Sequence, residues 1–326
     1  MKENEFRAFC AQRNLHAEQV DAAVATVHRF EDAARSNGDT LESANVDFLK
    51  GYIAGLIHSG DNSPEHLVAL LRYCYVADMH DLYVYLTGIL GGRSVVPSIA
   101  GRTGEVAGDD IRQRVFAHVA LPPLGSPQEQ YPEMTKQVLA GLQSHLPLET
   151  CRDILAGNHH RIPVDGFEAH KQAYRTSGLA GLLKYRHETL ISELEEHAKS
   201  GKPWYEQIIT PAVVEMVRQD PEIQAGVQVG DSVFVTKIPY SPVAYLAEDD
   251  PVRKRYYQCH CPLARASILD EASTVSPLLC YCSGGYEKLV FDVVFAEPVQ
   301  VKVVESALAG DLRCRFRIEI PESHVR

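Results

Sequence analysis

Apolar residues recur at helical spacing from the start of the chain to Gly226, and this pattern limits the possible folds most strongly. In segment 17–38, for example, Val20, Val24 and Val27 fall on one stripe, and Gly38 supplies a stop. Only after Gly226 does the pattern change to alternating, β-branched runs. This order predicts an α+β fold, in which a helical N-terminal region precedes a mixed helix and antiparallel-sheet domain.

A proline-rich segment, LPPLGSPQEQYP, interrupts the helical pattern at residues 121–132. Its four prolines cannot continue a helix or a central strand. We therefore expect three parts: a helical domain at 1–120, a linker at 121–132 and an α+β domain at 133–326.

Within the α+β part, alternating residues predict strands in 231–240, 298–306 and 313–321. The run GGYEKLVFDVVFAE at 284–297 predicts a short helix opened by glycines. We expect a further strand at 278–282, in the segment LLCYC.

Charge and hydropathy exclude several classes of protein. The formal net charge of −11 comes from interspersed acidic and basic residues, so there is no basic surface for a nucleic-acid backbone. No apolar run is long enough to cross a membrane, and the first residues do not resemble a signal sequence. We therefore expect a cytoplasmic protein with no direct nucleic-acid partner and no membrane partner.

The cysteines are concentrated near the C-terminus. Isolated cysteines in helical segments, namely Cys10, Cys74 and Cys151, are expected to be inert core residues. The other five are Cys259, Cys261, Cys280, Cys282 and Cys314. In a reducing compartment, clustered thiols are more often metal ligands or redox centres than disulfides.

Three interpretations of this cluster compete. The first is a metal site, since zinc takes four N, S or O donors and both Cys259/Cys261 and Cys280/Cys282 are two residues apart. In a strand, such spacing directs both sulfurs to one face. The second is a redox thiol pair and the third is buried, unreactive cysteines. We expect zinc, with iron as the alternative.

Glu305 is a further candidate ligand. It ends the apolar run VQVKVVE, and a hairpin through AGD would return Cys314 to its vicinity. The residues alone slightly favour a solvated strand end at Glu305.

The run CYCSGGYEKLVFDVVFAEPVQVKVVESALAGDLRCRF resembles the 4-vinyl-reductase-type small-molecule-binding domain, which is also the sensor module of phenol-responsive transcription activators. Shared elements are a cysteine before Gly-Tyr, a helix, a strand ending in glutamate, and Gly-Asp-x-x-Cys before a strand. In that family a zinc ion lies next to a buried pocket for an aromatic or other small apolar ligand. The resemblance implies Cys280, Glu305 and Cys314 as zinc ligands.

The sequence departs from the family pattern at Leu308, where the family has another cysteine. A fourth donor would then come from Cys259, Cys261 or Cys282. The C-terminal part, including LAGNHHRIP, TKIPY and YYQCHCP, also resembles a bacterial family of uncharacterised proteins distantly similar to L-2-amino-thiazoline-4-carboxylate hydrolases.

Other polar residues are candidates for catalysis or ligand binding. His159 and His160 lie in the loop AGNHHRIP, where one imidazole would be a general base near the metal. Lys237 and Tyr240 end a strand, where Lys237 would anchor a carboxylate. A set at the start of a helix would offer free N–H groups to an anion, namely Ser283, Gly284 and Gly285.

These observations predict a zinc-binding protein whose C-terminal domain holds a pocket for an apolar or carboxylate-bearing small molecule. The alternative is a zinc-dependent hydrolase of a small cyclic amide or amidine, with His159, His160 or Glu305 handling protons. Four protein ligands would favour binding, and three plus water would favour catalysis. A third possibility is an interaction scaffold, in which the N-terminal helices form a homodimer or cover the pocket.

Overall fold

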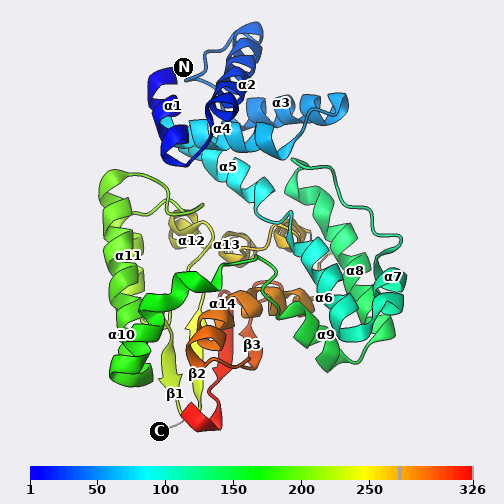
Figure 1. Cartoon of the computed structure of the whole chain (residues 1–326), viewed down its shortest axis with the longest axis vertical. Helices are drawn as coiled ribbons and strands as arrows, with labels where there is room; N and C mark the ends of the chain where they lie inside the picture. The colour runs from blue at the N-terminus through cyan, green and yellow to red at the C-terminus, as the bar shows by residue number, and fades with distance from the viewer. Residues whose placement is uncertain (271–273, 325–326) are drawn as a thin grey trace.

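A computed structural model describes residues 1–270 and 274–324, and it has the predicted α+β architecture (Figure 1). The N-terminal helices are α1 (Glu3–Gln12), α2 (Ala17–Ser36), α3 (Val46–Ser59), α4 (Pro64–Val76) and α5 (His80–Leu90). The next helices are α6 (Val95–Ala107), α7 (Asp109–Phe116), α8 (Tyr131–His145), α9 (Leu148–Leu155), α10 (Glu168–Ser200) and α11 (Pro211–Gln219). The C-terminal elements are β1 (Val227–Val229), β2 (Ser232–Thr236), α12 (Pro242–Ala247), α13 (Pro251–Gln258), α14 (Cys280–Phe295), β3 (Val301–Glu305) and β4 (Arg315–Glu319).

Local signals explain where several helices begin. Ser63 accepts a hydrogen bond from the backbone of α4, and Thr210 does the same for α11. In both cases proline occupies the first helical position, where no backbone donor is needed. The long helix α10 is interrupted at Gly178, whose φ of 66° and ψ of −165° are not helical.

The strands form one antiparallel sheet in the order β1-β2-β4-β3. The predicted hairpin between β3 and β4 is present, and it places Glu305 opposite Arg315, the residue after Cys314. A correction concerns residues 278–282. They form a short 3-10 turn and the start of α14 instead of a strand, because Ser276 and Pro277 start a helical turn that continues into the helix.

The hydrophobic core divides between Ile89 and Val95. Residues from Phe6 to Ile89 form one cluster, whereas Val95 begins a second cluster that continues into the sheet. Helices α6 and α7, which we expected to group with the N-terminal helices, therefore share the core of the C-terminal part. Leu124, in the expected linker, packs against the N-terminal cluster. Figure 1 shows α1–α5 at the top and the sheet with α14 below.

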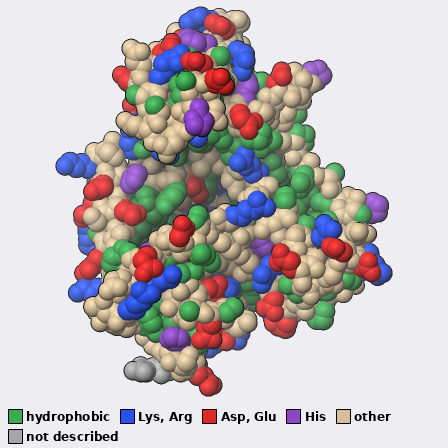
Figure 2. All heavy atoms as spheres, viewed as in Figure 1, with side chains coloured by type: hydrophobic (Ala, Val, Ile, Leu, Met, Phe, Trp, Pro, Cys, Tyr) green, Lys and Arg blue, Asp and Glu red, His purple; other side chains and the backbone are tan. Residues whose placement is uncertain are grey.

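The three isolated cysteines are buried in helices, as predicted. Within the described residues, we find no helix with the length and apolarity needed to cross a membrane. Figure 2 shows a hollow at the centre of one face, below the N-terminal helices.

Two glycines allow helix α14 to pack closely against its neighbouring elements. A Cβ atom on Gly285 would lie 2.6 Å from the backbone of Ala156 and Gly157, which follow α9. A Cβ on Gly284 would lie 3.2 Å from Val301 of β3. The absence of side chains at these positions lets α14 approach both α9 and the sheet.

We predict that Gly285→Ala destabilises the protein by about 1–3 kcal/mol, because the added methyl would overlap backbone atoms that cannot rotate away. The matched control is Gly51→Ala, in the middle of α3, where a Cβ meets nothing within 4 Å. That substitution should be neutral or stabilise by up to about 1 kcal/mol. Urea unfolding measures both, and equal effects of the two substitutions would contradict the close packing of α14.

Candidate thiol-lined site

Four of the predicted ligands lie around one small cavity. Cys259 and Cys261 follow α13, Cys280 begins α14, and Cys314 precedes β4. The cavity measures about 10 Å³, which is room for one water molecule or one ion. The other residues that line it are Lys237, His260, Leu279, Ser283, Leu308 and Phe316.

Backbone hydrogen bonds hold the segments that carry these cysteines. The amide of Lys237 donates to the carbonyl of Cys314 at 2.9 Å, which joins the end of β2 to the segment before β4. The amide of Arg265 donates to the carbonyl of Cys261 at 2.8 Å and closes the turn after α13. Cys280 Sγ lies 2.9 Å from the hydroxyl of Ser306. The four cysteines therefore come from three separate segments of the fold, the turn after α13, the start of α14 and the residue before β4.

Burial keeps the four thiols protonated. It raises the pKa of Cys259, Cys261 and Cys314 to about 12, and it raises that of Cys280 well above its ordinary value. Neighbouring thiols add to the effect of burial, since a second negative charge close by is unfavourable; for Cys261 this neighbour is Cys282, and for the other three it is a cysteine of the cavity. Lys237 lowers the pKa of three of these thiols, but burial outweighs it, so a further cation in direct contact with the sulfurs would be needed to hold them as thiolates at neutral pH.

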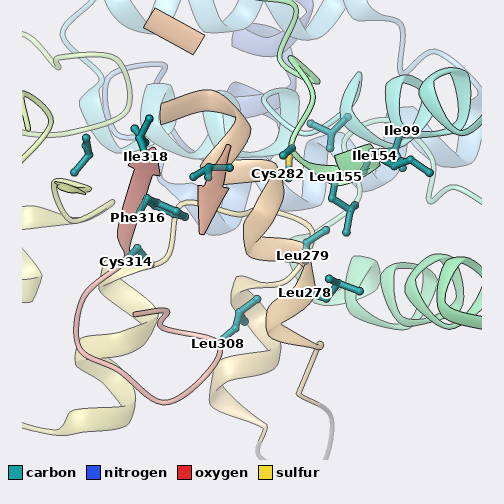
Figure 3. Packing of buried hydrophobic residues seen from close by; sticks show 14 of the residues in the cluster. Ile99, Ile154, Leu155, Leu278, Leu279, Cys282, Leu308, Cys314, Phe316 and Ile318 are labelled. Atoms are coloured by element: carbon teal, nitrogen blue, oxygen red, sulfur yellow. The ribbon is translucent and has the colours of Figure 1, made fainter. Parts of the chain in front are cut away.

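Cys282 and Glu305 do not line the cavity. Because Cys280 and Cys282 lie in a helix, their side chains point about 200° apart around its axis. In Figure 3, Cys282 lies apart from Cys314, on the side of the view occupied by Ile154 and Leu155.

Glu305 accepts two hydrogen bonds from Arg313, at 2.6 and 3.0 Å. This ion pair is partly exposed, with 27% of the Glu305 side chain and 44% of the Arg313 side chain accessible. The structure therefore agrees with the solvated strand end that the residues alone favoured.

Lys237 is a buried cation at the cavity. Its Nζ lies 3.3 Å from Glu287 Oε1, and only 9% and 3% of the two side chains are exposed. The Nζ also lies 4.8 Å from the centre of the Tyr286 ring. Burial opposes the charge on Lys237, but Glu287 and Tyr286 outweigh it and raise the pKa of the lysine. The contact with Glu287 is an ion pair without hydrogen-bond geometry, since Oε1 has no hydrogen-bond partner.

A second cation, on a half-buried side chain, lies near the same carboxylate. Arg186 of α10 donates hydrogen bonds to the carbonyl oxygens of Gln224 and Ala225, and its guanidinium interacts electrostatically with Glu287. Neither Arg186 nor Glu287 was identified from the sequence. Glu287 was missed because GYEKL resembles an ordinary solvated stretch of helix. The available signal was the apolar run that follows, LVFDVVF, which indicates that α14 is buried on most sides.

The two adjacent histidines have different environments. His159 is buried, and its ring nitrogens lie 2.8 Å from the carbonyl of Ile154 and 3.1 Å from the hydroxyl of Ser98. Because both ring nitrogens have hydrogen-bond partners, His159 anchors the loop and is not available as a general base.

His160 is exposed, and its ring meets Tyr286 edge-on with centroids 5.6 Å apart. Although part of the side chain is open to solvent, partial desolvation of the ring, followed by the charge of Lys237, lowers the pKa of His160 to about 4. His160 is therefore neutral at neutral pH and available as a hydrogen-bond donor or acceptor.

The other predicted ligand-binding residues have packing roles. Tyr240 is buried under the guanidinium of Arg265, which lies 3.8 Å from the centre of its ring. Helix α14 begins at Cys280, so Gly284 and Gly285 lie beyond its first turn and have helical hydrogen-bond partners. Ser283, in contrast, lines the cavity.

His260 also borders the cavity. Its Nε2 lies 2.6 Å from the carbonyl of Ile238, and its Nδ1 lies 3.8 Å from Glu206. Among the residues that the structure describes, no group of three or more His, Cys, Asp or Glu side chains has the arrangement of a metal centre as it stands.

Comparison with known proteins adds a partial match. Residues 233–325 match DUF6144, a family of unknown function. This segment contains all four cysteines of the cavity, together with Lys237 and Glu287. No curated protein and no solved structure matches the chain.

We predict that Lys237→Met costs about 3–5 kcal/mol of stability, because it leaves the buried Glu287 without its ion-pair partner and with only the electrostatic interaction of Arg186. The double variant Lys237→Met/Glu287→Met should recover most of this loss, since it removes both charges and conserves volume. Urea unfolding of the two variants and the wild type measures the difference. Equal stability of the single and double variants would show that the ion pair is unimportant.

We also predict that His160 contributes to acid sensitivity. The pKa of His160 is about 4 in the folded protein and 6.5 for an unperturbed histidine, so the unfolded chain binds more protons between these values. Stability therefore falls as the pH drops from 6.5 toward 4.

We expect His160→Phe, which keeps an aromatic ring against Tyr286, to weaken the pH dependence of the unfolding free energy in this range. The change in slope should correspond to at most about one bound proton per chain. His58→Phe, at an exposed position in the last turn of α3, controls for the loss of a histidine elsewhere. An unchanged slope in His160→Phe would contradict the lowered pKa.

Proposed function

We propose that the C-terminal part of this protein binds one zinc ion through Cys259, Cys261, Cys280 and Cys314. The observation that carries the proposal is the convergence of four cysteines, from three separate segments, on a cavity the size of one ion. Four thiolates satisfy the preferred coordination number of zinc. Coordination would require the cysteine side chains to rotate toward the cavity, because the described residues hold no metal-binding arrangement as they stand.

The four protonated thiols would have to ionise for zinc to bind. Binding of zinc would displace four protons, and the charge of the metal would compensate the thiolates that form. Lys237 is a further positive charge beside the cysteines, and it lowers the pKa of Cys259, Cys261 and Cys314. A tetrathiolate zinc centre carries a net charge of about −2, which a buried lysine would partly compensate.

The donor set favours a closed, structural site. Four thiols are present without Glu305, which is bound to Arg313, so no coordination position needs to remain for water. We therefore favour a binding protein over a zinc-dependent hydrolase. Free thiols at all eight cysteines fit a reducing, cytoplasmic location.

The small-molecule ligand would bind on the side of Lys237 that faces away from the thiol-lined cavity, next to His160 and Tyr286. The cavity itself is too small for an organic molecule, whereas His160 and Tyr286 are exposed next to the lysine. An aromatic edge, a neutral imidazole and a buried cation together suit a small apolar molecule that bears a carboxylate. The zinc centre would hold α13, α14 and β4 around this surface.

The decisive experiment is metal analysis of protein purified without added metal. We expect about one zinc per chain in the wild type and a substantial loss in Cys280→Ala. The matched control is Cys282→Ala, which removes a buried thiol from the same helix but not from the cavity. This control should retain its zinc.

Two results would contradict the proposal. Wild-type protein free of metal, and unable to take up zinc under reducing conditions, would remove the site. Equal loss of zinc from Cys280→Ala and Cys282→Ala would show that the four cysteines at the cavity are not the ligands.

A further inference from the structure

A second cavity lies among the N-terminal helices. It measures about 970 Å³, at the upper end of the range of small-molecule sites, and is open on one side. Its walls come from α2 and α4, with the end of α3 and the turn after α1. None of these elements carries a residue of the thiol-lined site.

Three arginines line this cavity, namely Arg29, Arg72 and Arg93. Within the described residues, none of them forms a salt bridge, and Arg29 donates a single hydrogen bond to Thr26. Unpaired guanidinium groups bind carboxylates and phosphates through two parallel hydrogen bonds. The cavity therefore offers sites for anionic groups in a chain whose net charge is −11.

The arginines of α2 and α4 lie at different ends of the cavity. Arg29 acts electrostatically on Tyr52 and His66, whereas Arg72 acts on Cys10 of α1. His66 and Arg72 are six positions apart on α4, which corresponds to about 9 Å along the helix. A ligand that reaches both ends must be elongated.

The remaining charges in the cavity are two carboxylates. Asp61 accepts a hydrogen bond from the hydroxyl of Ser59 at 2.8 Å, and Glu65 lies in the first turn of α4. Because the three arginines outnumber these two carboxylates, the cavity carries a net positive charge. The walls between the charged ends include short apolar side chains, at Ala22, Ala23, Ala25 and Ala69.

We propose that this cavity binds an elongated organic anion with carboxylate or phosphate groups at both ends and an apolar body between them. Arg72 binds one end and Arg29 the other, while the alanines contact the body. The binding does not depend on the zinc site, because the two cavities share no residue.

Calorimetric titration with suberate and with hexane-1,6-diol bisphosphate, which carry carboxylates or phosphates at both ends of an apolar chain, tests the proposal and separates carboxylate from phosphate recognition. At least one of the two should bind to the full-length protein at low ionic strength, and added salt should weaken the binding. Arg72→Gln should weaken it about tenfold or more, since a charge-assisted hydrogen-bond pair is lost.

Two control variants make the test specific. Arg35→Gln removes an arginine that lies on α2 but is paired with Glu31 and Asp32 outside the cavity, so affinity should not change. Glu65→Gln removes a negative charge from the cavity and should leave affinity equal or improved. Absence of binding by both anions, or equal affinity in Arg72→Gln and Arg35→Gln, would overturn the proposal.

Discussion

The close approach of α14 to the sheet and to the turn after α9 positions the rest of the C-terminal part. Gly284 and Gly285 permit this approach, because a methyl group at either position would press against Val301 or the backbone of Ala156. The helix thereby carries Cys280 to the cavity at its first residue and Glu287 to Lys237 two turns later. The thiols and the buried ion pair consequently depend on the same packing contact.

The electrostatics of this region follow from its burial. Lys237 and Glu287 are buried as an ion pair, the partly buried Arg186 interacts with the same carboxylate, and the charge on Lys237 or Glu287 would be unfavourable without the other. Lys237 is the common neighbour of the cysteines, Glu287 and Tyr286. A bound cation at the cavity would complete this arrangement by allowing the thiols to ionise, and this is the physical basis of the proposed zinc site.

The two cavities have opposite characters and lie in different parts of the chain. One is lined by thiols and has room for a single ion, whereas the other is open, contains three arginines and has room for an organic molecule. The division of the hydrophobic core between Ile89 and Val95 separates them. This division is compatible with two binding functions in one chain. The large cavity lies beside the N-terminal hydrophobic cluster, and the thiol-lined cavity lies beside the C-terminal one.

The sequence by itself determined the α+β class, most helices, the β3–β4 hairpin and the concentration of cysteines, because these features depend on local periodicity and spacing. Only the tertiary structure decided which cysteines share a cavity. Cys280 and Cys282 look equivalent when read as a strand, but the helix directs them to different sides. The pairings of Lys237 with Glu287 and of Glu305 with Arg313 were likewise decided by packing. A buried charge and a solvated one look alike in sequence, because burial depends on segments that are distant along the chain.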